Sequence, residues 1–188
     1  MKKKKGVISF NRKGVSPIVA TVLILLITIV AASLISVFVI PFVKEGLSGG
    51  EDCFKVLGDL KFDEQPYNCN YFNNTASRTG FSVRLDDENI KGFKVTLGKD
   101  GSADPYEITD GGTDPLLTML DPSNDFGDPL DFPSRGGVRT YVANGTFDRV
   151  NLFPILENGR LCEESDSIEL VTCVGMDIIN DLVAAGNG

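Results

Sequence analysis

The chain has 188 residues, with 18 basic and 26 acidic side chains and a formal net charge of −8. This length suffices for one folded domain beyond an N-terminal segment. The acidic balance disfavours nucleic acid as a partner, because the surface repels phosphate groups. The sequence contains no histidine, which excludes Ser-His-Asp and Cys-His catalytic arrangements and every histidine-ligated metal site.

The N-terminal region combines a basic segment with a long apolar run. The basic residues Lys2, Lys3, Lys4, Lys5, Arg12 and Lys13 all precede Val15. The 29 residues from Val15 to Val43 include no charged side chain, and as a helix they would span about 43 Å. A bilayer core needs only about 20 helical residues, and a secretory signal has an apolar region of about 7–15. We therefore expect a membrane-spanning helix over residues 15–45 rather than an export signal.

The charge distribution predicts the orientation of this helix. Six basic residues precede it, whereas only Lys44, beside Glu45, follows it directly. Positive charge accumulates on the cytoplasmic side of membrane helices, so the N-terminus is expected in the cytoplasm and residues 46–188 outside.

The helix is longer than a single span requires. A lone anchor would absorb the surplus by tilting or by breaking at Pro41, whereas an assembly would cover it with copies of the same helix. At helical spacing, small residues share one stripe, which favours close helix packing in an apolar medium: Pro17, Thr21, Thr28, Ala32 and Ser36. Small residues are also common in membrane spans generally, so the stripe leaves both interpretations open.

The junction before the apolar run resembles a known export signal. Arg12-Lys13-Gly14 followed by Val15-Ser16-Pro17-Ile18-Val19-Ala20-Thr21 is similar to the class III signal peptide and mature N-terminus of archaeal type IV pilins and archaellins. The resemblance covers about the first 45 residues and implies that a prepilin peptidase cuts between Gly14 and Val15, with Lys13 part of its recognition site. Residues 1–14 would then be the signal peptide. The chain has Val19 where bacterial pilins have Glu, so subunit register would depend on apolar packing.

The resemblance implies a structural role. The chain is expected to be a pilin that assembles into a homo-oligomeric helical filament on the cell surface, with an adhesive or surface-contact role. As a precursor it would lie in the cell membrane. The alternative is a monomeric single-pass envelope protein whose head binds a surface layer, a glycan or another partner. Whether the subunit would be a major or a minor pilin stays open.

Residues 46–50 are rich in glycine and predict a flexible linker. From residue 51 to 188, short apolar runs alternate with turn residues, which is typical of an all-β domain. Residues 81–85 and 93–97 alternate apolar and polar side chains and are expected as strands. Residues 167–173 form a further expected strand, and residues 177–185 a short helix. The prediction is an antiparallel β-sandwich head, which is also what the resemblance implies.

Residues 138–152 predict a β-hairpin. Two strand-like runs flank Asn144-Gly145, a dipeptide that readily takes the positive backbone angles of a type I′ turn.

Four cysteines, Cys53, Cys69, Cys162 and Cys173, all follow the apolar run. Their even number, their wide spacing and the lack of a Cys-x-x-Cys motif predict structural disulfides in an oxidising compartment rather than a zinc site. Four cysteines allow three pairings. The local pairing, Cys53 with Cys69 and Cys162 with Cys173, is preferred but not required by the sequence.

Two Asn-x-Thr motifs, which begin at Asn73 and at Asn144, are candidate attachment sites for N-linked glycans. Both are expected in turns, where a bulky glycan is tolerated. Asn144 has a second explanation, because it is also the first residue of the expected hairpin turn.

An aspartate-rich stretch with four prolines lies between residues 100 and 131. Oxygen-rich loops hold Ca²⁺ in other proteins, but the spacing does not match an EF-hand, so turn formation and solubility are the favoured explanation. No phosphate-binding loop, Gly-x-Ser-x-Gly elbow or His-Glu-x-x-His motif is present. We expect neither enzymatic activity nor a cofactor.

Overall fold

The computed structural model describes residues 16–186, except for the side chains of residues 44–49. The chain divides into two compact units at the boundary between Gly49 and Gly50. Each unit is described by itself.

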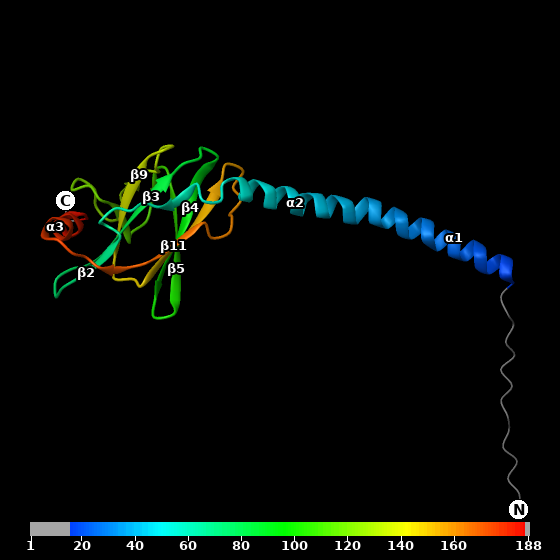
Figure 1. The fold of residues 1–188 in the computed structure, drawn as a ribbon, viewed down its shortest axis with the longest axis horizontal. Helices are drawn as coiled ribbons and strands as arrows, with labels where there is room; N and C mark the ends of the chain where they lie inside the picture. Colours follow the sequence, from blue (N-terminus) through cyan, green and yellow to red (C-terminus); the bar gives the residue numbers. More distant parts are fainter. Residues whose placement is uncertain (1–15, 187–188) are drawn as a thin grey trace, which may run out of the picture. The chain divides into compact units, whose positions relative to one another are not determined.

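The first unit is helical (Figure 1). It comprises α1 (Pro17–Leu34), a π-helical turn (Ile35–Val39) and the first part of α2 (Ile40–Lys55). Pro17 occupies the first turn of α1, where its fixed φ angle suits a helix and its missing N–H costs no hydrogen bond. The expected apolar helix is therefore present over its described residues, and its helical conformation continues beyond residue 45.

The π-helical turn lies directly before Pro41. The backbone N–H of Ile40 donates to the carbonyl of Ile35, five residues earlier. A proline in a helix has no N–H to donate, and its ring crowds the carbonyl four residues before it, here that of Val37. A widened turn at this place accommodates the proline without ending the helix.

The prediction of a flexible linker at residues 46–50 is wrong, because these residues are helical and α2 continues through them to Lys55. Glycine is a poor helix former but can adopt helical angles when the flanking sequence supports them. In the last turns of α2, Lys55 Nζ lies 3.2 Å from the Glu51 carboxylate and 3.6 Å from that of Asp52. These pairs, at i,i+4 and i,i+3 spacing, support the end of the helix.

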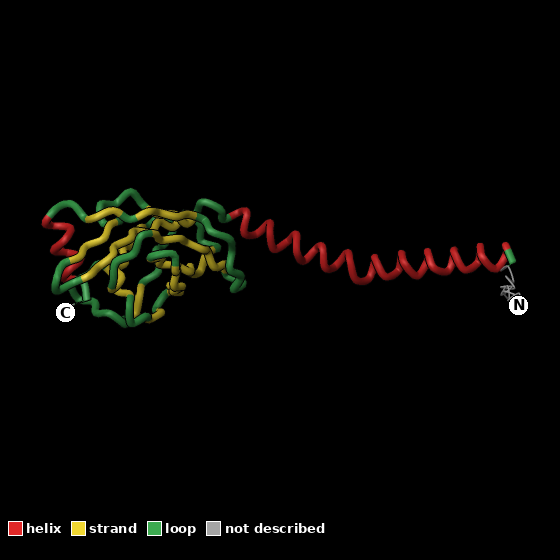
Figure 2. Tube along the Cα trace, turned by 90° about the horizontal axis from the view of Figure 1, so that it is seen from below, coloured by secondary structure: helices red, strands yellow, loops and turns green. Residues whose placement is uncertain are grey.

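The head contains two main sheets (Figure 2). The first has six strands: β1 (Leu60–Phe62), β2 (Cys69–Phe72), β3 (Ser77–Leu85), β7 (Leu117–Met119), β9 (Val138–Asn144) and β12 (Val171–Thr172). Their order is β12-β2-β3-β9-β7, and β1 also pairs with β3. All of these pairs are antiparallel except β12 with β2, which is parallel.

The second sheet is fully antiparallel, in the order β11-β10-β4-β5. Its strands are β4 (Ile90–Lys99), β5 (Ser102–Thr109), β10 (Arg149–Leu156) and β11 (Asp166–Glu169). The short strands β6 (Gly112–Thr113) and β8 (Pro129–Leu130) pair separately.

The main core lies between the two sheets. Alternate residues of each strand point into it, among them Phe81 of β3, Tyr141 of β9 and Phe93 of β4, all fully buried. The ring of Tyr141 lies 5.6 Å from that of Phe81 and 5.8 Å from that of Phe93. The predicted helix followed by a β-sandwich head is thus confirmed.

A second, smaller core lies on the outer face of the first sheet. Helix α3 (Met176–Ala184) packs there through Leu182, against Val142 and the Cys69–Cys173 disulfide. Val142 alternates with Tyr141, so neighbouring residues of β9 serve different cores. The short C-terminal helix expected at 177–185 is present and begins one residue earlier.

The hairpin expected at 138–152 is wrong. β9 pairs with β3 and β7, whereas β10 pairs with β4 and β11 in the other sheet, so the chain crosses between sheets at residues 145–148. Asn144 has no positive φ angle, which excludes a type I′ turn there. Such a turn instead joins β4 to β5, where Asp100 (φ 50°) and Gly101 (φ 83°) lie between the paired residues Lys99 and Ser102.

The single strand expected at 167–173 is divided. β11 belongs to the second sheet and β12 to the first. Between them, Leu170 packs against the main core, and its N–H donates to the Asp148 carbonyl. This segment therefore passes from one sheet to the other.

Candidate functional site

The strongest functional feature is the exposed apolar helix. Within the helix from Pro17 to Val43, a stretch of 18 residues has a mean hydropathy of 3.0, and no residue of the helix is buried within the described part of the chain. By length and composition this helix is able to cross a membrane. Such a surface is unfavourable in water, because the free energy falls when each apolar side chain is transferred out of the solvent.

The hydroxyl groups of the helix are satisfied within the helix itself. Thr21 Oγ1 donates to the Ile18 carbonyl at 2.9 Å, and Thr28 Oγ1 to the Leu25 carbonyl at 2.8 Å. The Ser33 and Ser36 hydroxyls likewise donate to carbonyls four residues earlier. None of these groups needs water or a partner side chain, so the helix can enter an apolar environment at little polar cost.

The predicted stripe, Pro17, Thr21, Thr28, Ala32 and Ser36, is exposed along its length. Pro17, Thr21, Thr28 and Ala32 lie in α1, where the regular helical period keeps them on one face. Ser36 lies in the π-helical turn, so the stripe ends there.

A second feature of the helix surface was not anticipated from the sequence. An apolar hollow on the helix surface is lined by Leu26, Ile27, Val30, Ala31 and Leu34. At the helical period Leu26, Ile27, Val30 and Leu34 lie opposite the small-residue stripe, whereas Ala31 lies about 60° from Thr28, at the edge of the hollow nearest the stripe. A helical-wheel plot of side-chain volume would have indicated this hollow, because Ala31 is small and its neighbours on the helix surface are large. The helix therefore presents two different faces to any neighbour.

The predicted cleavage site, Lys13, Gly14 and Val15, lies outside the described residues.

The cysteines form two disulfides, but the preferred local pairing is wrong. Cys53 is bonded to Cys162, and Cys69 to Cys173. Cys53 and Cys162 adjoin the main core, whereas Cys69 and Cys173 lie in the second core under α3. The first sheet separates the members of each local pair. Disulfides persist in oxidising compartments, which indicates a location outside the cytoplasm.

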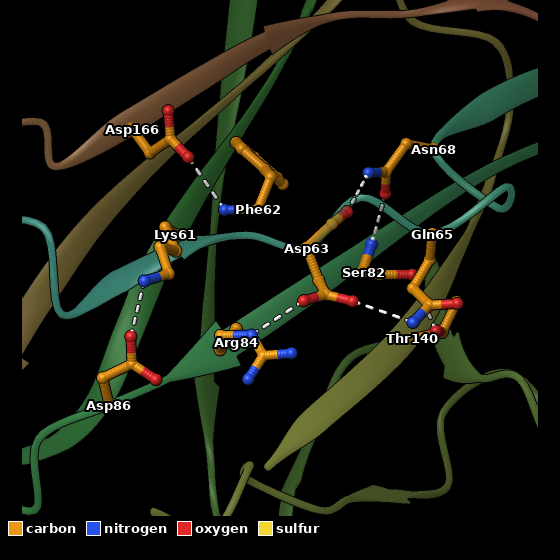
Figure 3. A network of polar contacts seen from close by, with 10 residues as sticks. All are labelled: Lys61, Phe62, Asp63, Gln65, Asn68, Ser82, Arg84, Asp86, Thr140 and Asp166. Atoms are coloured by element: carbon orange, nitrogen blue, oxygen red, sulfur yellow. Dashed lines mark hydrogen bonds and ion pairs between the residues drawn. The ribbon is translucent and has the colours of Figure 1, made fainter. Parts of the chain in front are cut away.

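A polar network holds β1 and the following segment against β3 (Figure 3). Arg84 Nε donates to the Asp63 carboxylate at 2.7 Å, and Lys61 Nζ lies 2.6 Å from Asp86 Oδ2. The hydrogen bond from Arg84, with a second from Gln65, lowers the pKa of the Asp63 carboxyl. These charges are engaged with partners on neighbouring segments, which suits a structural role.

The side-chain amide of Asn68 holds the segment after β1 against β3. Asn68 Nδ2 donates to the Asp63 carbonyl at 2.6 Å, and Asn68 Oδ1 accepts from the Ser82 N–H at 2.7 Å (Figure 3). On the other side, Asp166 Oδ2 accepts from the Phe62 N–H. The network thus joins β1 to strands of both sheets.

The aspartate-rich stretch forms turns. Asp114 Oδ1 accepts from the Leu116 N–H, and Asp121 Oδ1 accepts from both the N–H and the hydroxyl of Ser123. The backbone hydrogen bond from Ser123 is the main cause of a lowered pKa at Asp121. Within residues 16–186, no group of three or more acidic or cysteine side chains is arranged to hold a metal ion.

The two candidate glycan acceptors lie in different settings. Asn73 is in the loop between β2 and β3, and Asn144 is the last residue of β9. Both side chains are exposed. Asn144 does not serve a hairpin turn, because β9 and β10 belong to different sheets.

Taken together, these contacts leave the apolar helix as the described surface that most requires a partner. In the head, the two disulfides and the polar network around β1 stabilise the fold. Comparison of the chain with models of protein families, with curated proteins and with solved structures finds no match.

Proposed function

We propose that this protein is a structural subunit of a cell-surface filament of the type IV pilus kind, held together by its N-terminal helix. The observation that carries the proposal is the helix from Pro17 to Val43, which is uncharged and exposed along its whole length. At about 1.5 Å per residue it extends about 40 Å, beyond the roughly 30 Å of a bilayer core. Packing against copies of itself would cover all of it.

The two faces of the helix favour a filament over a closed dimer. A helical array needs a heterologous interface, in which one surface of a subunit meets a different surface of the next. The small-residue stripe permits close approach, and the hollow lined by Leu26, Val30 and Leu34 offers space on the other side. We propose that the stripe of one subunit packs toward the hollow of its neighbour.

The precursor would reside in the membrane with its N-terminus in the cytoplasm. Cleavage by a prepilin peptidase after Gly14 would remove six positive charges. These charges hold the precursor's N-terminus at the cytoplasmic face, because moving them into an apolar filament core is costly. The disulfide-bonded head would then face solvent and provide adhesion or surface contact.

The processing step is tested by mass spectrometry of the mature protein from membrane and surface fractions. We expect an N-terminus at Val15. Gly14→Val should block cleavage, whereas Gly6→Val, a matched change within the basic segment, should leave it intact. A mature chain that begins elsewhere, or normal cleavage of Gly14→Val, would contradict the proposed processing.

Assembly is tested by electron cryomicroscopy of filaments sheared from the cells that make the protein. We expect the head to repeat along a fibre whose core consists of packed helices. If the mature protein occurs only as monomers that keep their helix in a bilayer or in detergent, the filament proposal is wrong, and a single-pass envelope protein is the better description.

A further inference from the structure

We propose that Asn73, and not Asn144, is the acceptor of an N-linked glycan on the folded head. This inference is independent of filament assembly. Both residues begin an Asn-x-Thr motif, so the sequence alone treats them alike. In the structure the two motifs differ in how exposed their three residues are and in the hydrogen-bond partners of their side chains.

The Asn73 motif is open to a transferase. Asn73, Asn74 and Thr75 are all exposed, in the four-residue loop that follows the Phe72–Ser77 pair of β2 and β3. This loop projects from the head at the teal end of β2 (Figure 1). An enzyme can therefore surround all three motif residues without displacing a strand, as a modification on a loop tip requires.

The side chains of the Asn73 motif are already in contact with one another. Asn73 Oδ1 accepts from the Thr75 hydroxyl and from the Thr75 N–H, both at 2.8 Å, and from the Ala76 N–H at 2.7 Å. These bonds hold the carboxamide by its oxygen. The Asn73 nitrogen, the atom that would carry the sugar, donates only one of its two hydrogens, to the Tyr71 hydroxyl.

This arrangement suits the chemistry of transfer. The second hydrogen of Asn73 Nδ2 is available to leave as a proton when Nδ2 bonds to the C1 atom of a lipid-phosphate-linked oligosaccharide, and the departing lipid phosphate accepts that proton. The bond from C1 to the phosphate oxygen breaks at the same time, and the lipid phosphate leaves with the bonding electron pair. The linked nitrogen keeps one hydrogen, so its bond to Tyr71 can persist.

The Asn144 motif is held in the sheet. Its asparagine is exposed, but Gly145 and Thr146 are partly buried. The Asn144 N–H donates to the Leu116 carbonyl of the neighbouring segment, and the Gly145 N–H donates to the Ser77 carbonyl. Thr146 Oγ1 accepts from Lys99 Nζ at 3.0 Å rather than contacting Asn144. The motif cannot enter an enzyme cleft without breaking these contacts.

The Asn144 side chain also stabilises a mostly buried charge. Its Oδ1 accepts from Arg78 Nη1 at 2.9 Å, and the Arg78 guanidinium lies 4.8 Å from the centre of the Phe126 ring. Burial lowers the pKa of Arg78, and its Nε has no hydrogen-bond partner. Turning Asn144 away would remove one of the few polar partners of this cation, which is unfavourable.

The experiment measures the intact mass and the glycopeptides of the full-length protein purified from the cells that produce it naturally. Asn73→Gln and Thr75→Val should each lower the intact mass by one whole glycan, whereas Thr75→Ser should retain it. Asn74→Gln changes the neighbouring amide but preserves the motif, and Asn144→Gln breaks the other motif. Both of these variants should keep the wild-type glycan mass.

Two results would overturn the inference. One is a wild-type mass that equals that of the processed polypeptide, with no glycopeptide at Asn73. The other is a glycan on Asn144, alone or in addition. Thr75→Val separates loss of the acceptor motif from loss of the loop, because it leaves Asn73 and its bonds to the backbone N–H groups in place.

Discussion

Cys53, in the last turn of α2, is bonded to Cys162, a residue 109 positions later in the chain, and their Cα atoms lie 5.5 Å apart. The second disulfide, between Cys69 and Cys173, also closes a long loop, with a sequence separation of 104. Long loops gain the most from cross-linking in the chain-entropy description, because they restrict the unfolded state most. The head is therefore expected to depend on both bonds.

Replacing either bonded pair by serine, Cys53 with Cys162 or Cys69 with Cys173, should lower the free energy of unfolding by about 2–5 kcal/mol. The measurement is urea unfolding of the full chain in detergent without reductant. A non-reducing peptide map of the wild type should link Cys53 to Cys162. A map that links Cys53 to Cys69 would show that the local pairing exists after all.

Ala32→Leu and Ala31→Leu should each reduce the yield of sheared filaments at least tenfold. The first enlarges a residue of the small-residue stripe, and the second enlarges the smallest residue that lines the hollow, so each obstructs close helix packing. Ser33→Leu is the comparison, because Ser33 belongs neither to the stripe nor to the residues that line the hollow, and it should leave most of the yield. All three chains remain apolar and should insert equally into membranes. Equal losses in all three would argue against packing through these two faces.

Gly80→Ala should destabilise the head by about 1–3 kcal/mol. A Cβ atom at Gly80 would collide with the Tyr67 carbonyl oxygen and lie 2.8 Å from Leu182 Cδ2, where α3 packs on β3. Gly50→Ala is the control, because a Cβ there meets nothing within 4 Å, and alanine favours a helix over glycine. Thermal unfolding of both variants measures the contrast, and a Gly80→Ala head as stable as the Gly50→Ala head would contradict the packing described.

The Asp63–Arg84 ion pair predicts acid sensitivity of the head. Because the folded pKa of Asp63 is lowered, the unfolded chain binds its proton more readily, and stability rises with pH through this window. The contribution is complete above the unfolded value of about 3.9 and disappears as the pH falls through the folded pKa.

Asp63→Asn should therefore be less stable than the wild type at pH 7 and should show a smaller loss of stability below pH 4. Urea unfolding at a series of pH values measures this. The pair is partly exposed, so the effect should be modest. Parallel pH profiles for wild type and Asp63→Asn would show that this carboxylate does not contribute.

The sequence predicts this fold well where the signal is local and strong. The apolar run from Pro17 to Val43 predicts a helix, and the alternation at Phe81–Leu85 predicts a strand whose apolar side chains share one face; both are present. Which strands are neighbours is not a local property. Asn144-Gly145 has the composition of a tight hairpin turn, yet the chain crosses there to the other sheet, and Asp100-Gly101 forms the turn instead.

The disulfide pairing fails as a prediction for a related reason. Proximity in sequence favours Cys53 with Cys69, but β1 lies between them and the two residues reach different cores. The parallel pairing of β12 with β2 brings Cys173 beside Cys69, and that pairing has no local sequence signal. The same limit applies to Asn73 and Asn144, because both begin an Asn-x-Thr motif and the contacts that hold Asn144 in place come from segments distant in the sequence.

The π-helical turn before Pro41 has a consequence for any contact map of this helix. The widened turn contains one residue more than a turn of α-helix. The side chains that follow it are therefore rotated by about 100° around the helix axis relative to a uniform α-helix. Positions before Ile35 and after Val39 therefore cannot be projected onto one helical wheel. In a bundle, Phe42 and Val43 would meet a different neighbour from the one that a uniform period assigns to them. Cross-linking studies should choose reporter pairs separately on the two sides of the proline.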